Sequence, residues 1–394
     1  MRTVKRNPFL SGAFAALGAV VLTAGVARAD ITSDRPAGLI VIPKLVFDSG
    51  NGNGFLGSGT GNGFPVDTEI QLTNTSGVPV RLHCYYVNAN SHCSTSGDVC
   101  AQTEDCGLFG GLCFEGWVET DFKVNLSPHQ PIIWTISHGL PFPPLSFDAI
   151  PEVNEDPFMG ELKCVQVGPN DEPINRNDVK AEATIVQYRD GFVDARAYNG
   201  IGIQAIAPDG DNLLVLGGPD PEYNGCPNVI ILDHFFDNAV EPVTGRYLKT
   251  HLTCVPCTQN FDLQSLFNTT VQFLVFNEFE QRFSASRSIR CFKEFELCAL
   301  GTGKDRPFMN NAWNYQSCER SIFSAGVSGT FAGQTRVRGV DDGSPSHGNG
   351  LLCVAEEFYR RDRDDLSTVE ASTAFNLHWA GLREEADFWF IGRE

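Results

Sequence analysis

The feature that most constrains the fold is an internal repeat that runs through most of the chain. Four short signatures occur in the same order in each half, at similar offsets. The pairs are GLIVIPKLVFD (38–48) and NVIILDHFFD (228–237), EIQLTNTSGVPVRLHCYY (69–86) and VQFLVFNEFEQRFSASRSIRCF (271–292), GELKCV (160–165) and GLLCV (350–354), and Ala197-Tyr198-Asn199 and Ala374-Phe375-Asn376. The period is far longer than that of solenoids or propellers, so it predicts two like domains rather than an array.

The local pattern within the repeat is that of β-strands. EIQLTN (69–74) alternates apolar and polar residues, and SGVP (76–79) marks a turn before the next alternating run. No segment carries a long helical stripe, and the chain is rich in glycine (39) and phenylalanine (29). We therefore predict an all-β fold of two tandem antiparallel β-sandwich (Ig-like) domains from an internal duplication, with long loops and disulfides.

Turn-forming residues set the expected domain boundaries. PDGDNLLVLGGPDPEYNG (208–225) is dense in Pro, Gly and Asp and predicts a linker. Domain 1 is expected over 35–207, with a cysteine-rich insertion at 93–113, and domain 2 over 226–394.

The N-terminus has the pattern of a signal peptide over residues 1–29. Arg2, Lys5 and Arg6 form a basic region, an apolar stretch of small residues follows, and Ala27-Arg28-Ala29 has the A-x-A form of a cleavage site. No later apolar run approaches the ~20 residues of a membrane-spanning helix, so no transmembrane segment is expected after cleavage. The mature chain is predicted to be secreted or periplasmic, in a bacterium.

The charge argues against nucleic acid as a partner. Cleavage removes four basic residues and no acidic ones, which takes the formal charge from −19 to about −23. A chain this acidic is repelled by nucleic acid and by anionic membrane surfaces. An unknown protein or carbohydrate ligand is the expected partner.

The chain has 13 cysteines, and in an oxidising compartment disulfides are their expected state. The repeat predicts one equivalent bridge in each domain, Cys84–Cys164 and Cys291–Cys353. Three connectivities are possible within the insertion, and we favour the nested one. The bridges expected outside the repeat signatures are Cys93–Cys113, Cys100–Cys106 and Cys298–Cys318. Cys226, Cys254 and Cys257 are left over, so one thiol would have no partner inside the monomer.

A metal-binding redox module is one alternative. His83-Cys84 and His92-Cys93 repeat an H-C pair, and these ligand types suit zinc or copper. Against a shared site, neighbours on a strand point to opposite faces. CVPC (254–257) has the spacing of redox motifs, but it does not sit between a strand and a helix, so structural pairing is the favoured interpretation. No cofactor is predicted.

A carbohydrate-active enzyme is the other alternative. No G-x-S-x-G or H-E-x-x-H motif is present, so no catalytic residue is assigned, and His234 and His378 are interpreted as sheet residues. Neighbouring carboxylates such as Glu356 and Glu357 should face opposite ways on a strand and not form an acid/base pair. The aromatic residues considered as platforms for stacking on a sugar are Tyr85, Tyr86, Trp117, Trp134, Trp313, Trp379 and Trp389.

Several stretches resemble a group of uncharacterised exported bacterial proteins. They are DTEIQLTNTSGVPVRLHCYYVNANSHC (67–93), EDPFMGELKC (155–164), YNGCPNVIILDHFFD (223–237) and VQFLVFNEFEQRFS (271–284). The resemblance implies export but no activity, ligand or site residue. Together with the repeat and the cysteines, it predicts an exported, disulfide-stabilised protein with a non-enzymatic binding or structural role.

Overall fold

The structure is a computed structural model of the whole chain. It describes residues 35–50, 65–100, 103–107, 109–114, 116–141, 149–189, 192–235, 247–264, 267–297, 332–340, 348–360 and 369–392. The predicted signal peptide and the predicted Cys298–Cys318 bridge lie outside these residues. Apart from one short 3₁₀ helix, η1 (Thr103–Cys106), the elements of the described residues are β-strands. The all-β, sandwich-like prediction is therefore confirmed.

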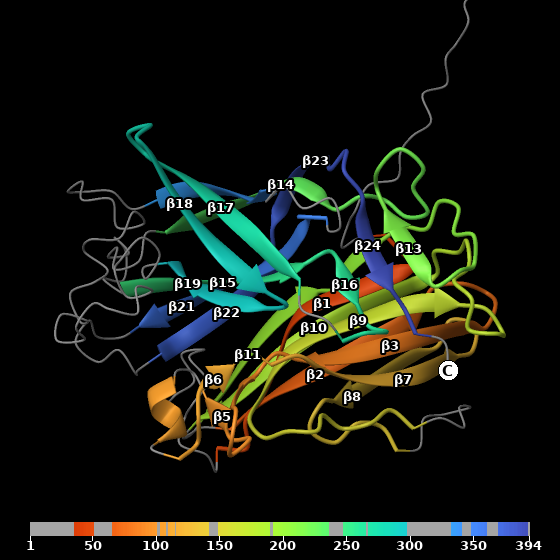
Figure 1. The fold of residues 1–394 in the computed structure, drawn as a ribbon, viewed down its shortest axis with the longest axis horizontal. Coiled ribbons are helices and arrows are strands. Elements are labelled where there is room, and N and C mark those ends of the chain that lie inside the picture. The colour runs from red at the N-terminus through yellow and green to blue at the C-terminus, as the bar shows by residue number, and fades with distance from the viewer. Residues whose placement is uncertain are drawn as a thin grey trace, which may run out of the picture.

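Two sheets form the first sandwich, shown in the lower half of Figure 1. Sheet I has the order β12-β1-β9-β3-β7 and contains β1 (Leu39–Phe47), β3 (Val80–Asn88), β7 (Val118–Leu126), β9 (Phe158–Val167) and β12 (Ile201–Ile203). Sheet II has the order β11-β10-β2-β8 and contains β2 (Val66–Asn74), β8 (Pro131–Thr135), β10 (Val179–Arg189) and β11 (Phe192–Asn199). Alternate residues such as Ile40, Ile70 and Leu82 meet in one core between them.

A second pair of sheets forms the second sandwich. Sheet III has the order β23-β14-β20-β17-β18 and contains β14 (Pro227–Phe235), β17 (Asn268–Asn277), β18 (Arg282–Arg290), β20 (Ala332–Val340) and β23 (His378–Leu382). Sheet IV has the order β22-β21-β15-β19 and contains β15 (Tyr247–Pro256), β19 (Lys293–Glu296), β21 (Leu351–Arg360) and β22 (Val369–Asn376). Leu232, Leu252 and Phe273 lie in the core between these two sheets.

The two sandwiches have the same strand order. Taken along the chain, each strand of sheets I and II has a counterpart at the same position in sheets III and IV. The correspondence differs in part from the one suggested by the sequence signatures. The signatures pair β17 with β2 and β21 with β9, but by position in the sheets β17 corresponds to β3 and β21 to β10. For two other pairs, β1 with β14 and β11 with β22, the signatures and the sheet positions agree. In these two cases the sequence signatures matched strands that have similar burial patterns but occupy different positions in their sheets.

The segment 208–225 is more than a linker. Its residues Leu213–Leu216 form β13, which pairs with β24 (Asp387–Phe390), and β24 pairs in turn with β16 (Gln259–Asn260). We call this three-stranded unit the bridging sheet. Figure 1 shows it lying over β1, β9 and β3 of sheet I. Its Leu214 and Trp389 share a core with Val41 and Val165 on the outer face of sheet I. The central strands β1, β9 and β3 of sheet I are therefore buried on both faces, which explains the near-continuous apolar run of β1.

A buried ion cluster joins the two sandwiches. The register of β1 shifts between Ile42 and Leu45, so that Lys44 is directed towards the second sandwich. Its Nζ lies 2.7 Å from Glu294 Oε2 on β19 and also binds Glu356 on β21. Burial alone would lower the pKa of Lys44, but these two carboxylates raise it above its ordinary value. The charges are thus paired across the contact rather than left isolated.

The edge strands β11 and β22, which occupy equivalent positions, lie side by side at this contact. Asn199 N donates to Asn376 Oδ1 (2.9 Å), and Asn376 Nδ2 donates back to Asn199 O (2.7 Å). Close by, Arg196 Nη1 donates to Ser372 Oγ (3.1 Å), and Ser372 Oγ donates to Asp194. The two Ala-aromatic-Asn signatures therefore contact each other where the sandwiches meet.

Candidate functional site

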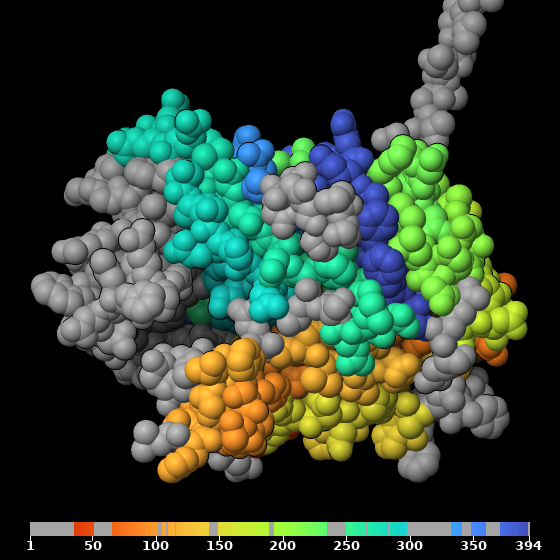
Figure 2. All heavy atoms as spheres, in the orientation of Figure 1, coloured from red at the N-terminus to blue at the C-terminus, as the bar shows by residue number. Residues whose placement is uncertain are grey.

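A disulfide-stapled arm extends from the first sandwich. The arm comprises residues 91–114 and contains a three-stranded sheet. In this sheet β4 (Ser91–Cys93) lies between β5 (Val99–Cys100) and β6 (Cys113–Phe114), and η1 connects β5 to β6 along the chain. Figure 2 shows it in orange at the lower left of the molecule. The arm joins β3 to β7, whereas their counterparts β17 and β18 are joined by a short turn at Glu278–Gln281. Only the first sandwich carries an insertion at this place.

The nested disulfide prediction for the arm is wrong. The bonds are Cys93–Cys106 and Cys100–Cys113. The nested pairing assumes a simple hairpin, but the chain forms a three-stranded sheet with β4 at its centre. The η1 turn brings Cys106 back to Cys93, which leaves Cys100 to bond with Cys113. The two overlapping loops hold the arm in one shape.

The base of the arm is fixed by one carboxylate. Glu155 Oε2 accepts hydrogen bonds from Asn88 Nδ2 (2.6 Å) and Asn90 Nδ2 (2.8 Å), and its Oε1 lies 2.8 Å from His92 Nε2. Asn90 Nδ2 also donates to Pro157 O (2.7 Å). These contacts attach the arm to the loop that precedes β9.

The arm presents apolar side chains to solvent. Phe109 is 89% exposed, and Leu112 and Phe114 are each 56% exposed. The same segment contains Asp98, Glu104 and Asp105 but no lysine or arginine. An exposed apolar group within an acidic surface is typical of a site for protein contacts.

The four residues considered as alternative zinc or copper ligands do not form a shared site. Cys84 is bonded to Cys164 and Cys93 to Cys106, so neither sulfur is available as a thiolate. His83 lies on the outer face of sheet I, where its Nε2 is 3.3 Å from Asp121 Oδ2, while His92 binds Glu155 at the arm base. The Cys84–Cys164 bridge predicted from the repeat is present, between directly paired residues of β3 and β9.

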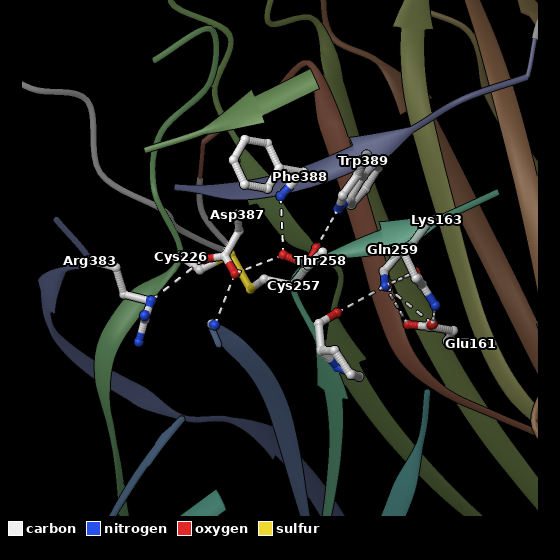
Figure 3. The surroundings of a disulfide bond; sticks show 12 residues. Glu161, Lys163, Cys226, Cys257, Thr258, Gln259, Arg383, Asp387, Phe388 and Trp389 are labelled. Atoms are coloured by element: carbon white, nitrogen blue, oxygen red, sulfur yellow. Dashed lines mark hydrogen bonds and ion pairs between the residues drawn. A yellow bond between two sulfur atoms is a disulfide. The ribbon is translucent and has the colours of Figure 1, made fainter. Parts of the chain in front are cut away.

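The predicted Cys291–Cys353 bridge is wrong. Cys353 on β21 is bonded to its register partner Cys254 on β15, and Cys226 is bonded to Cys257 (Figure 3). Cys291 is buried in the core beneath the bridging sheet. Because β21 corresponds in position to β10 and not to β9, the second bridge falls in sheet IV and has no equivalent in the first sandwich. The two cysteines of CVPC belong to separate bridges, so they form no dithiol redox pair.

The surroundings of the Cys226–Cys257 bridge hold one buried carboxylate (Figure 3). Asp387 accepts hydrogen bonds from Gly350 N (2.9 Å) and Thr258 Oγ1 (3.1 Å), and Arg383 Nε lies 3.6 Å away. These contacts favour the ionised carboxylate and act to lower its pKa, but the effect of burial is larger and raises the pKa of Asp387 to about 6. The cluster binds β24 to the strands beneath it, and its cysteine sulfurs are already bonded to each other, so it serves structure rather than metal binding.

A second buried group lies beside this bridge in Figure 3. Lys163 on β9 donates to Gln259 on β16 and to Pro256 O (3.2 Å), and it lies 3.2 Å from Glu161. Gln259 Nε2 completes the group by donating to Glu161 Oε1 (2.6 Å). All these side chains are buried and bind one another, which connects sheet I to the bridging sheet.

A pocket of about 550 Å³ opens at one end of the second sandwich. It is lined by Asp233 and His234 at the end of β14, Phe276, Asn277 and Glu278 at the end of β17, Ala332, Gly333 and Gln334 at the start of β20, and Glu357 on β21. We call it the end pocket. Its volume falls in the range of small-molecule sites.

Two of the pocket residues come from opposing sheets and face inward. His234 continues the inward series of Ile230 and Leu232 on β14, and Glu357 continues that of Cys353 on β21. His234 Nε2 lies 2.7 Å from Thr335 Oγ1. The sequence prediction treats His234 as an ordinary sheet residue, and no motif marks Glu357 as a pocket residue.

The acidic loop at 208–222 is satisfied by its own backbone. Carboxylate oxygens of Asp209, Asp211 and Glu222 lie within 4.8 Å of one another. Glu222 accepts from Asp209 N (2.8 Å) and Val215 N (2.7 Å), and Asp211 accepts from Leu213 N (2.7 Å). The Asp211 bond is that of an Asx-type turn, and Glu222 is held by two backbone N–H groups of the same loop, so the cluster is explained without an ion.

The aromatic residues considered as sugar platforms are mostly part of the cores. The buried ones are Tyr85, Tyr86, Trp117, Trp134 and Trp389. Trp379 is half-buried, and Trp313 lies outside the described residues. The described residues therefore give no exposed aromatic platform from that set.

Comparison with known proteins adds no identification. No protein-family model matches the chain, and no curated protein matches it significantly. Within the described residues, no helix has the length and apolar character needed to cross a bilayer.

Proposed function

We propose that the protein is an exported, disulfide-stabilised binding protein, built from two duplicated β-sandwich domains, that recognises a protein partner through its arm. The arm carries the proposal: Phe109 is 89% exposed at a place where two disulfides fix the backbone. A surface that is already rigid loses little conformational entropy on binding.

The arm's composition indicates the kind of partner. Phe109, Leu112 and Phe114 provide an apolar contact, and the acidic residues around them favour a partner whose apolar surface has a basic rim. The shared strand order of the sandwiches supports the duplication, and the five disulfides among the described residues suit an oxidising compartment outside the cytoplasm.

Site-specific photo-cross-linking tests the role of the arm in the producing cell. The cross-linker p-benzoylphenylalanine replaces Phe109 in one chain and Phe279 in a matched control. Phe279 is 57% exposed in the β17–β18 turn, the position that corresponds to the arm in the second sandwich. We expect a discrete protein adduct from position 109 that is absent from position 279 and is lost when Phe114→Ser is added. Equal adducts from both positions would argue against the arm.

Export is tested separately by sequencing the N-terminus of the protein recovered from the envelope or the medium. A chain that begins at Asp30 is expected. A chain that keeps Met1 and remains in the cytoplasm would contradict export without bearing on the arm.

A further inference from the structure

The outer face of sheet III is basic in an otherwise acidic protein. Inner positions of its strands, such as Ile230, Phe273 and Val337, lie in the core of the second sandwich, so the alternate positions face outwards. The charged residues at the outward positions of β14, β17, β18 and β20 are Arg282, Arg290, Arg336, Arg338 and Asp233. This balance is the reverse of that of the whole chain, which has 29 basic and 48 acidic residues.

Two of these arginines are held over the sheet by uncharged neighbours. Arg338 Nε donates to Gln272 Oε1 (2.7 Å), and the guanidinium of Arg336 lies 5.7 Å from the centre of the Phe276 ring. Both arginines are exposed. Neither contact removes positive charge, and a guanidinium has more N–H donors than these contacts use. Both side chains are therefore placed to bind a carboxylate from outside.

Apolar side chains lie beside the arginines. Leu274 on β17 and Ile231 on β14 flank Arg336 in the register of the sheet. Both are half-buried, so part of each side chain reaches the surface. We call the outer side of sheet III around Leu274, Ile231 and the four arginines the arginine face. It combines apolar contact area with a residue type that is enriched at protein interfaces.

The arm has the complementary composition. It presents Phe109, Leu112 and Phe114 to solvent, and its segment 91–114 contains three acidic residues and no lysine or arginine. Asp98 and Asp105 among these acids are exposed. Apolar side chains against apolar side chains, with carboxylates near guanidinium groups, form the pairing that favours association. The arginine face is thus the kind of surface that the arm is expected to bind.

A single chain cannot bring its arm to its own arginine face. Figure 1 shows the arm at the lower edge of the molecule and sheet III at the upper edge, with sheet IV between them. The arginine face looks away from sheet IV, because the core of the second sandwich lies between the two sheets. The arm is held to the first sandwich by Glu155. A contact between the two surfaces must therefore join different copies.

We propose that the arm of one molecule binds the arginine face of a second copy of this chain. The inference rests on the proposed function, because it makes a second copy the partner that the arm recognises. The contact is heterologous, since the two surfaces differ, and each bound pair still has an unoccupied arm and an unoccupied face. Copies therefore add head to tail, into a ring or an open filament, and do not stop at a symmetric dimer.

Sedimentation velocity on the purified mature protein tests the proposal over a range of protein concentrations. The wild type is expected to form oligomers larger than a dimer as the concentration rises. Arg336→Glu should weaken this association by at least about tenfold, since it sets like charges against the arm. Phe109→Ser should weaken it to a similar degree by removing the most exposed apolar contact. Arg81→Glu makes the same charge change at an exposed position of sheet I, and should alter the association by less than about twofold.

A mixture of the two weakened variants gives a sharper test. Phe109→Ser keeps its arginine face and Arg336→Glu keeps its arm, so one contact forms between them and no further copy adds. We expect a heterodimer with one molecule of each, at concentrations where either variant alone is monomeric. A misfolded variant could not restore the contact, so this result also shows that both variants are folded.

Several results would overturn the inference. They are a wild type that stays monomeric at every concentration, an association that Phe109→Ser leaves unchanged, and a mixture that stays monomeric although both variants keep the wild-type thermal midpoint. Binding of an acidic polysaccharide such as alginate to a protein that does not self-associate would assign the arginine face to a polyanion instead. If the purified protein is monomeric while position 109 still cross-links to another protein in the cell, the second copy is wrong as the partner and the proposed function stands.

Discussion

The ion cluster between the sandwiches allows a quantitative test through Lys44→Met. Methionine keeps most of the apolar length but leaves Glu294 and Glu356 without their shared cation. Removing one partner of a buried ion group costs about 3–5 kcal/mol. Part of this loss is offset, because Arg196 stays 2.9 Å from Glu356 and His251 Nδ1 stays 2.5 Å from Glu294. We therefore expect the free energy of unfolding to fall by about 3 kcal/mol at pH 7.

Urea unfolding followed by intrinsic fluorescence measures this loss, and Lys123→Met is the matched control. Lys123 lies 2.8 Å from Asp171, but the two side chains are 35% and 29% exposed, so its removal should cost less than about 1 kcal/mol. The Lys44 effect should also diminish at acid pH. Burial acts to raise the pKa of Glu294, yet Lys44 and His251 hold it well below its ordinary value. In the variant this carboxyl takes up a proton more readily, so the loss shrinks as the pH falls below about 4.5. Equal losses for the two lysine variants would refute the reasoning.

Other predictions concern titration and disulfides. Burial raises the pKa of Glu119 to about 8, above its ordinary 4.5, so the folded state binds more protons between these values and stability falls as the pH rises through them. Glu119→Gln should therefore be more stable than the wild type by roughly 2 kcal/mol at pH 8 and equal to it at pH 4 in thermal unfolding; a wild-type advantage at pH 8 would contradict this. The Cys84–Cys164 bridge spans 80 residues, so replacing both cysteines with alanine should lower the free energy of unfolding in guanidinium by about 4 kcal/mol, and a loss below about 1 kcal/mol would show that the bridge contributes little. Non-reducing peptide mapping should recover Cys254 joined to Cys353, and any bridge within CVPC would be inconsistent with the structure.

Much of the fold can be predicted because its signals are local. Period-two alternation marks β2, whose residues are alternately buried and exposed or half-exposed as the pattern requires. The near-continuous apolar run at 38–47 marks a strand but does not show what covers its second face. Only the packing of the bridging sheet, which includes part of the expected linker, explains that run.

The disulfides separate local from non-local information most clearly. The Cys84–Cys164 bridge followed from the repeat, and the same argument failed for Cys291–Cys353. The argument needs the true correspondence of strands, and the structure shows that β21 occupies the position of β10. Likewise, the nested prediction for the arm failed because the sheet order, with β4 at the centre, decides which cysteines meet.

The candidate sites show the same division. A cysteine-rich insertion in one half was visible in the sequence, since composition and spacing are properties of a single segment. The exposure of Phe109 and the burial of Glu357 were not, because each depends on which distant segments surround the side chain. The sequence by itself determined strand character, the signal-peptide pattern and the position of the arm. Only the tertiary structure decided which cysteines bond, that Glu356 meets Lys44 and Arg196, and where a pocket opens, because contacts between residues far apart in the chain are set by packing and not by local pattern.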